Sequence, residues 1–307
     1  MSVVVGFSFP EEAVIISDSR ISFVNGEAVV GSKDDLRKIF PLTPYLAIGF
    51  TSENVDLTLK IISKLEVYIR DQAKVNIVYY LLQKLPKVAE YEYKKLTKSM
   101  TKLPGMEFMF AGILSDRALN VPEPIAIDIM TKGGGGAVPE PIGRALMTMK
   151  NGYLRIDPPT PVIMKQRLPS GEVSNLGTWT VAAIGSGSSI QSLFEKEYSR
   201  IMTSEPAPIG SFRSNFIRII CDDFIKKSHI PTVGGAVQVL RINAKGVSGV
   251  NSSFKRIFSD SSIKDISSME FDGEKWISKN YETGTTKVIK SYFPPIIKVY
   301  SKTKCNR

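Results

Sequence analysis

The spacing of apolar residues predicts a first block of strands followed by two helices. β-Branched and aromatic runs in the first 50 residues are typical of strands, and they lie at 2–9, 11–24, 27–31 and 37–50. The first two are expected to be joined by a turn near Pro10, and the last to contain two strands around Pro41 and Pro44. From Asn54 the spacing becomes helical, with Asn54 or Ser52 as the cap. A second helical region at 75–100 is expected to kink or break at Pro86.

A similar succession of strands and helices follows in the second half of the chain. A stretch rich in glycine and proline, 131–178, is expected to be mostly a loop or insertion, with a possible hairpin of 153–156 and 161–168. The other predicted elements are strands at 106–116 and 123–130, a strand entering a glycine turn at 179–189, helices at about 190–203 and 209–228, a strand at 234–242, and short strands after 245.

This order predicts an α+β fold rather than a parallel α/β fold. Helices come in sequential pairs, and the strands between them are placed to pair antiparallel, which suggests a layered sandwich. We expect one domain over 1–245, with the insertion at about 131–178, and a basic C-terminal extension over 246–307. The chain shows no heptads and no internal repeats.

The charge and cysteine content narrow the classes of partner and compartment. About half of the net charge of +10 lies in 246–307, but the lysines are spread along the chain. A solvated basic face is therefore favoured over nucleic-acid binding. No apolar stretch is long enough to cross a membrane, and the N-terminus does not have the pattern of a signal peptide. Cys221 and Cys305 are expected to be unpaired thiols in the cytoplasm.

Histidine and glycine motifs offer little further chemistry. His229 is the sole histidine, which excludes histidine-rich metal sites, and we expect it to be structural at a helix end. The glycine turn "IGSGSS" lacks the lysine of a nucleotide-binding loop. No metal or cofactor is therefore expected.

Ser2 is the first candidate for chemistry. Its small side chain permits removal of Met1, and Ser2 would then carry both a hydroxyl and a free α-amine. An α-amine has a pKa of about 7.7–8.0, so near neutrality part of it can accept the hydroxyl proton. This pairing places a nucleophile beside its own base.

Several motifs occur in an order that resembles proteasome β-type subunits and their bacterial relatives. These motifs are "SVVVGFSF", "AVIISDSRIS", "RKIF", "LAIGF", "FMFAGILSD", "AIDI", "AAIGSGSS" and "GGAVQV". The resemblance covers about 2–128 and 178–242, and it rests on the joint order of the pieces. It implies the four-layer αββα sandwich of N-terminal-nucleophile hydrolases, an activity on a peptide or amide substrate, and assembly into a homo-oligomer.

Carried over to this chain, the resemblance implies a set of site residues. Ser2 falls on the nucleophile, Lys38 on the active-site lysine, and Asp18 on the acid that orients this lysine. A buried lysine needs such a carboxylate partner. Ser186 falls on the serine near the nucleophile's amine. The expected binding residues are Arg20, Ser52, Gly185 and Gly187.

The chain also departs from the family pattern. An aspartate and a serine that support the amine are replaced by Ile230 and Val233, which cannot hydrogen-bond through their side chains. The glycine whose amide forms the oxyanion hole falls near Thr51 or Ser52, where a backbone N–H is still present. Two readings stay open: an amidohydrolase or peptidase that forms an acyl-enzyme at Ser2, and a catalytically inactive assembly or binding subunit.

Overall fold

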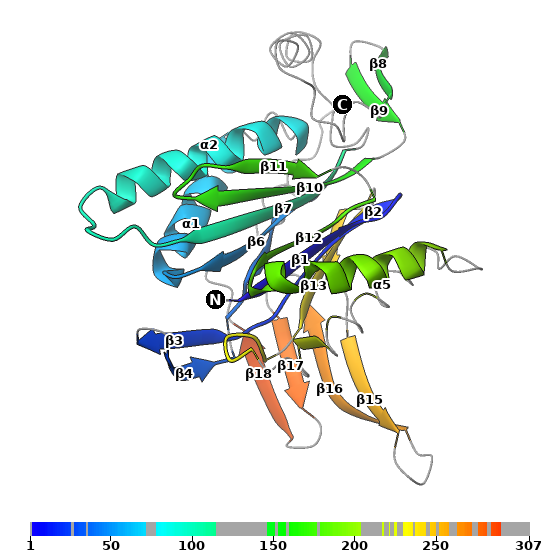
Figure 1. Cartoon of the computed structure of the whole chain (residues 1–307). Coiled ribbons are helices and arrows are strands. Elements are labelled where there is room, and N and C mark those ends of the chain that lie inside the picture. Colours follow the sequence, from blue (N-terminus) through cyan, green and yellow to red (C-terminus); the bar gives the residue numbers. More distant parts are fainter. Residues whose placement is uncertain are drawn as a thin grey trace.

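The computed structural model of the chain forms a mixed α+β fold with antiparallel sheets (Figure 1). The structure describes residues 2–25, 28–34, 36–71, 78–114, 146–150, 153–157, 160–176, 179–203, 217, 221, 224–225, 230–235, 237–243, 246–249, 252–257, 263–271, 276–280 and 284–289.

One five-stranded sheet contains the N-terminus. Its strand order is β12-β1-β2-β13-β14, and neighbouring strands run antiparallel throughout. The strands are β1 (Val3–Ser8), β2 (Glu12–Ser17), β12 (Val181–Gly185), β13 (Gln238–Asn243) and β14 (Gly246–Gly249). β1 and β2 are buried along their whole length, as expected for apolar strands covered on both faces.

A second antiparallel five-stranded sheet has the order β11-β10-β7-β6-β5. Its strands are β5 (Ile39–Thr43), β6 (Leu46–Ser52), β7 (Met106–Leu114), β10 (Thr160–Leu168) and β11 (Val173–Leu176). Pro41 lies within β5, which is an edge strand. An edge tolerates proline because one side of the strand needs no N–H donor.

Smaller sheets complete the strand content. Two are two-stranded, and one is a four-stranded meander near the C-terminus. Their strands are β3 (Ile21–Asn25), β4 (Ala28–Lys33), β8 (Leu146–Lys150), β9 (Tyr153–Asp157), β15 (Ser252–Ile257), β16 (Ile263–Phe271), β17 (Trp276–Asn280) and β18 (Thr285–Ile289).

Three α-helices lie in the described part of the chain: α1 (Val55–Asp71), α2 (Val78–Thr97) and α5 (Gln191–Thr203). A short 3₁₀ helix, η1 (Ser186–Ile190), leads into α5. The cap of α1 is Asn54, whose Oδ1 accepts a hydrogen bond from the Leu57 amide at 3.0 Å.

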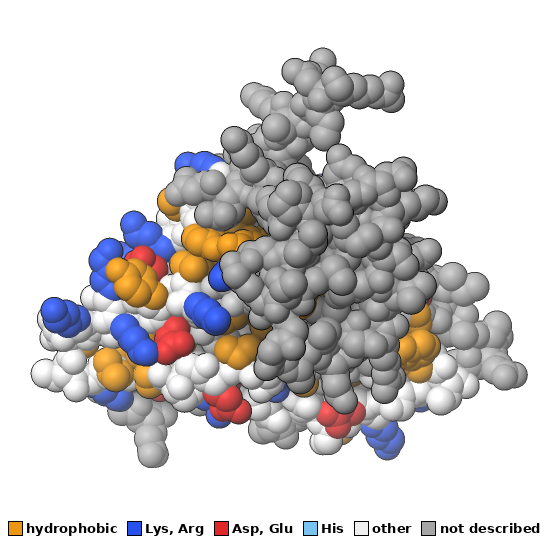
Figure 2. All heavy atoms as spheres, turned by 90° about the horizontal axis from the view of Figure 1, so that it is seen from above, with side chains coloured by type: hydrophobic (Ala, Val, Ile, Leu, Met, Phe, Trp, Pro, Cys, Tyr) orange, Lys and Arg blue, Asp and Glu red, His pale blue; other side chains and the backbone are white. Residues whose placement is uncertain are grey.

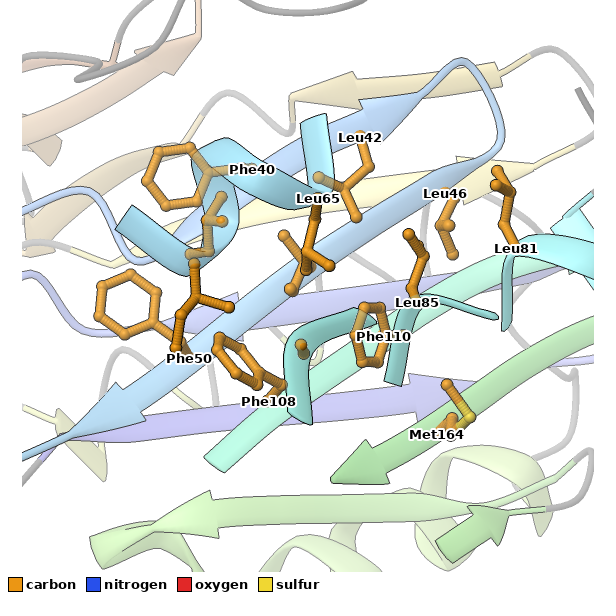
Figure 3. Packing of buried hydrophobic residues seen from close by; sticks show 14 of the residues in the cluster. Phe40, Leu42, Leu46, Phe50, Leu65, Leu81, Leu85, Phe108, Phe110 and Met164 are labelled. Carbon is orange, nitrogen blue, oxygen red and sulfur yellow. The ribbon is translucent and has the colours of Figure 1, made fainter. Parts of the chain in front are cut away.

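Three buried clusters relate the helices to the sheets. One joins the second sheet to α1 and α2, and Figure 3 shows part of it, including Phe50, Phe108 and Phe110. Another combines side chains of both five-stranded sheets, among them Ile15 and Ile163. The last lies between the first sheet and α5, and the described helical positions 217, 221, 224 and 225 join it.

The described segments confirm much of the predicted element order, with four differences. The run 11–24 forms two strands rather than one, because the chain leaves the ladder at Asp18. α2 continues through Pro86 without a break. Residues 160–176, expected to lie in an insertion, form β10 and β11, and β10 is an interior strand of the second sheet. β9 pairs with β8, so the expected hairpin of 153–156 with 161–168 was wrong.

Two findings bear on membranes and on the basic surface. No helix in the described residues has the length and apolar character needed to cross a membrane.

Figure 2, which looks down on the α2 side of the molecule, shows Lys and Arg side chains interspersed with hydrophobic and acidic ones. On α2, Lys94 pairs with Glu90 one helical turn away, at 2.5 Å.

Candidate functional site

Asp18 organises the polar core of the site at the point where β2 ends. Its Oδ1 accepts hydrogen bonds from the Lys38 ammonium at 2.7 Å and from the Val3 amide at 3.0 Å. Its Oδ2 accepts from the amides of Arg20 at 3.3 Å and Gly234 at 3.2 Å. The carboxylate is fully buried, so these four donors replace its hydration.

Lys38 immediately precedes β5 and is fully buried. Its backbone is fixed on both sides, because its amide donates to Gln238 Oε1 at 3.1 Å and its carbonyl accepts from the Phe50 amide at 3.1 Å. Its ammonium donates to Asp18 and to the Arg20 carbonyl, the latter at 2.5 Å. Burial lowers the pKa of Lys38, and the charge and hydrogen bond of Asp18 oppose this shift.

Ser2 lies beside this buried pair, at the start of β1. The Asp18 oxygen that accepts from the Lys38 ammonium also accepts from the Val3 amide, which forms the peptide bond to Ser2. The Ser2 carbonyl accepts a hydrogen bond from the Ser186 amide at 2.8 Å. Ser2 is half-buried whereas Asp18 and Lys38 are fully buried, so the site opens toward solvent at Ser2.

The glycine turn after β12 lies directly against the N-terminal strand. Gly185 has a φ of 65°, and a Cβ there would lie 2.2 Å from the Ser2 carbonyl oxygen and 2.7 Å from Thr51 Cγ2. A Cβ at Gly187 would lie 2.5 Å from Val3 Cγ2. At Gly185 only glycine permits both the backbone conformation and the close approach, and at Gly187 the close approach alone disfavours a side chain, so the two glycines determine how Ser186 meets Ser2.

Thr232 is a polar residue of the site that sequence reasoning missed. Its hydroxyl lies 3.2 Å from the Ser186 hydroxyl, within hydrogen-bond distance. The flanking Ile230 and Val233 pack into the apolar cluster under α5, as their side chains require. The missed signal was the polar residue between these two apolar ones in "IPTVGG".

The remaining predicted binding residues have mainly structural contacts. Arg20 pairs with both oxygens of Asp34, at 2.8 and 3.1 Å, and this raises its pKa. It also donates to the Val233 carbonyl at 3.2 Å, which ties the residues after β2 to those before β13. The Ser52 hydroxyl bonds to the backbone of Asn54 and to Thr58 at the start of α1. Ser52 is therefore engaged in the helix cap.

Glu107 of β7 is a second residue that sequence reasoning missed. Its Oε2 accepts a hydrogen bond from the Gly185 amide at 2.6 Å, and its Oε1 accepts from Arg167 at 3.1 Å. Glu107 thus joins the second sheet to the glycine turn beside Ser2. Nothing in the sequence distinguishes it from an ordinary exposed strand residue.

The structure brings together Ser2, Asp18, Lys38, Ser186 and the glycines on either side of Ser186. This arrangement places the half-buried Ser2 one peptide bond before the amide that shares an Asp18 oxygen with the buried Lys38 ammonium. No three His, Cys, Asp or Glu residues in the described ranges are grouped so as to hold a metal ion. His229 and Met1 lie outside the described residues.

Neither a protein-family model nor a curated protein sequence matches the chain.

Proposed function

We propose that this chain is a proteasome-like N-terminal-nucleophile amidohydrolase or peptidase on a four-layer αββα sandwich. The three buried clusters support the four layers: one between the two large sheets, one under α1 and α2, and one under α5. The two sheets are antiparallel, and each combines strands from both halves of the chain.

The observation that carries the catalytic proposal is the buried pair of Lys38 and Asp18 next to Ser2. A fully buried ammonium is costly, and a stable protein retains one only where its partners are well placed. Here a single Asp18 oxygen holds both the ammonium, at 2.7 Å, and the amide that follows Ser2, at 3.0 Å. The same charge would stabilise a deprotonated serine oxygen at this position.

The proposed reaction begins with removal of Met1. The freed α-amine of Ser2 accepts the hydroxyl proton, directly or through water, and Oγ attacks the amide carbonyl of the substrate. The tetrahedral intermediate collapses to an acyl-enzyme, the C–N bond breaks, and the amine leaves with the proton. Water then attacks the ester, which releases the acid and restores Ser2.

Thr232 supports the proposal where the chain departs from the family pattern. The side chains of Ile230 and Val233 cannot hold the amine, but the Thr232 hydroxyl lies 3.2 Å from that of Ser186. Ser186 in turn bonds to the Ser2 carbonyl through its own amide at 2.8 Å. Thr232 would act as a positioning residue that orients Ser186 toward the amine.

Intact mass and covalent labelling test the proposal together. We expect the purified protein to lack Met1 and to form a single adduct with an epoxyketone or β-lactone probe. Ser2→Ala should abolish the adduct, and Ser99→Ala, which changes an exposed serine just after α2, should retain it. Retained Met1, or an adduct that persists in Ser2→Ala, would contradict the catalytic proposal.

The second candidate is a catalytically inactive subunit that serves in assembly or binding. It is favoured by the apolar packing of Ile230 and Val233, which leaves the amine without two of its usual supports. Under this alternative Met1 stays in place and no probe labels Ser2.

Under either candidate we propose that the chain forms a homo-oligomer. The resemblance to ring-forming subunits is the basis for this proposal. Light scattering at micromolar concentration should give a mass of several chains, and a monomer mass would contradict it.

A further inference from the structure

A polar pocket opens at one edge of the two large sheets, next to the candidate site. Its cavity volume is about 70 Å³ and it is partly open to solvent; this is enough for a side-chain carboxylate but well below the range of about 300–1,000 Å³ for ligand pockets. One wall comes from β7, β10 and β11, and the opposite wall from Ala183 and Ser188 near the glycine turn.

The strand pattern explains why this pocket is polar. Alternate residues of β10 face the same way, and Ile163 lies in the core cluster shared by the two sheets. Lys165 and Arg167 follow on the same face, and Ser174 of β11 lies opposite Lys165 in the ladder. The apolar filling between the sheets therefore ends at Ile163, and charged side chains line the space beyond it.

The charged side chains that line the pocket differ in whether they have an ion-pair partner. Arg167 pairs with Glu107 at 3.1 Å and with Glu172 at 3.7 Å. The other oxygen of Glu107 accepts the Gly185 amide. Lys165 is half-buried, and within the described ranges no carboxylate lies at ion-pair distance from its ammonium. The pocket thus contains a cation that a ligand can neutralise.

We propose that this pocket binds the carboxylate of an acidic residue in the substrate, with Lys165 as the ion-pair partner. Ser174 also lines the pocket, and its hydroxyl can donate a hydrogen bond to a carboxylate. A hydrogen bond between an ammonium and a carboxylate is roughly twice as strong as one between neutral groups, so pairing with Lys165 should strengthen binding.

The inference rests on the proposed function, because the pocket adjoins the candidate nucleophile. Glu107 lines the pocket and also bonds to the Gly185 amide at 2.6 Å. Gly185 in turn lies against the Ser2 carbonyl, where a Cβ would come within 2.2 Å. A substrate held at Ser2 would therefore have the pocket beside it, across the glycine turn.

Two epoxyketone probes of equal length, one carrying a glutamate side chain and one a glutamine, test the preference. Wild type should label roughly tenfold faster with the glutamate probe, equivalent to about 1.4 kcal/mol. Lys165→Gln should remove that preference by slowing labelling with the glutamate probe to about the rate of the glutamine probe. Lys87→Gln, which removes an exposed lysine on α2, is the matched control and should keep the preference.

Direct binding separates this inference from the proposed chemistry. N-acetylglutamate should bind the Ser2→Ala variant more tightly than N-acetylglutamine in an NMR titration, and adding Lys165→Gln should abolish the difference. If no probe labels Ser2 but this difference is seen, the proposed function fails and the anion pocket stands. Equal labelling rates and equal binding, with or without Lys165, would overturn the inference.

Discussion

Replacing Asp18 with asparagine is the sharpest test of the buried ion pair. The change keeps the size of the side chain but removes the negative charge that the Lys38 ammonium contacts at 2.7 Å. Each carboxylate oxygen of Asp18 accepts two hydrogen bonds, and in the variant the NH2 group of asparagine, which is itself a donor, would face two of these donors. At least one of these bonds is lost, and a buried ammonium is left without its counter-charge.

The expected cost follows from the complete burial of both side chains. Breaking a buried pair by removing one partner typically costs about 3–5 kcal/mol, because the remaining charge is uncompensated. We expect Asp18→Asn to lower the free energy of unfolding by about that amount at pH 7 and to abolish labelling of Ser2. In the variant the pKa of Lys38 should fall further, so below pH 10 the folded protein binds fewer protons than the unfolded protein. The loss of unfolding free energy relative to wild type should therefore become smaller as the pH rises toward 10.

Urea denaturation as a function of pH measures this effect. The matched control is Glu90→Gln, which breaks the exposed pair with Lys94 and should cost less than about 0.5 kcal/mol. Adding Lys38→Met to Asp18→Asn removes the stranded charge and should recover part of the loss. A loss below about 1 kcal/mol for Asp18→Asn, similar to that of the control, would refute the reasoning.

Three further predictions follow from single features of the structure. Gly185→Ala should destabilise the protein by about 1–3 kcal/mol more than Gly284→Ala in thermal unfolding, because both glycines have a φ of 65° but a Cβ meets nothing within 4 Å at Gly284. Equal losses would contradict a close approach at Gly185. Burial raises the pKa of Glu66 from its ordinary 4.5 to about 7. Between these values the folded state holds a proton that the unfolded state has released, so stability should fall by at most about 3 kcal/mol as the pH rises through this range. Glu66→Gln should flatten this part of the curve, and an unchanged slope would exclude the effect. Thr232→Val should slow labelling of Ser2 roughly tenfold with little change in unfolding temperature, and Thr232→Ser should restore the rate. An unchanged rate in Thr232→Val would show that its hydroxyl has no positioning role.

Local patterns in the sequence were sufficient for most of the described elements. The helical period from Asn54 and the β-branched runs around Val4 and Ile15 predict α1, β1 and β2, because each element buries one face or both. Asp18 and Lys38 were also predicted as partners from the resemblance alone. The structure shows this ion pair. Its physical reason is that a fully buried ammonium needs a carboxylate to balance its charge.

Tertiary structure decided what depends on contacts between distant segments. β10 could not be distinguished from an insertion, because its place in the interior of the sheet follows from pairing with β7, which lies far away in the sequence. Pro86 could not be recognised as an interior helix residue, because the packing of α2 against the second sheet, which buries Pro86 and can offset the cost of a proline inside a helix, forms only in the folded chain.

The candidate site likewise depends on contacts between distant segments of the chain. The sequence by itself determined which residues have the chemistry for it: a hydroxyl at position 2, a carboxylate at 18 and an amine at 38. Only the fold decided that Thr232 comes to lie beside Ser186 and Glu107 beside Gly185. These contacts join segments 46 and 78 residues apart, and no local pattern encodes which side chains meet when two strands pair or two sheets stack.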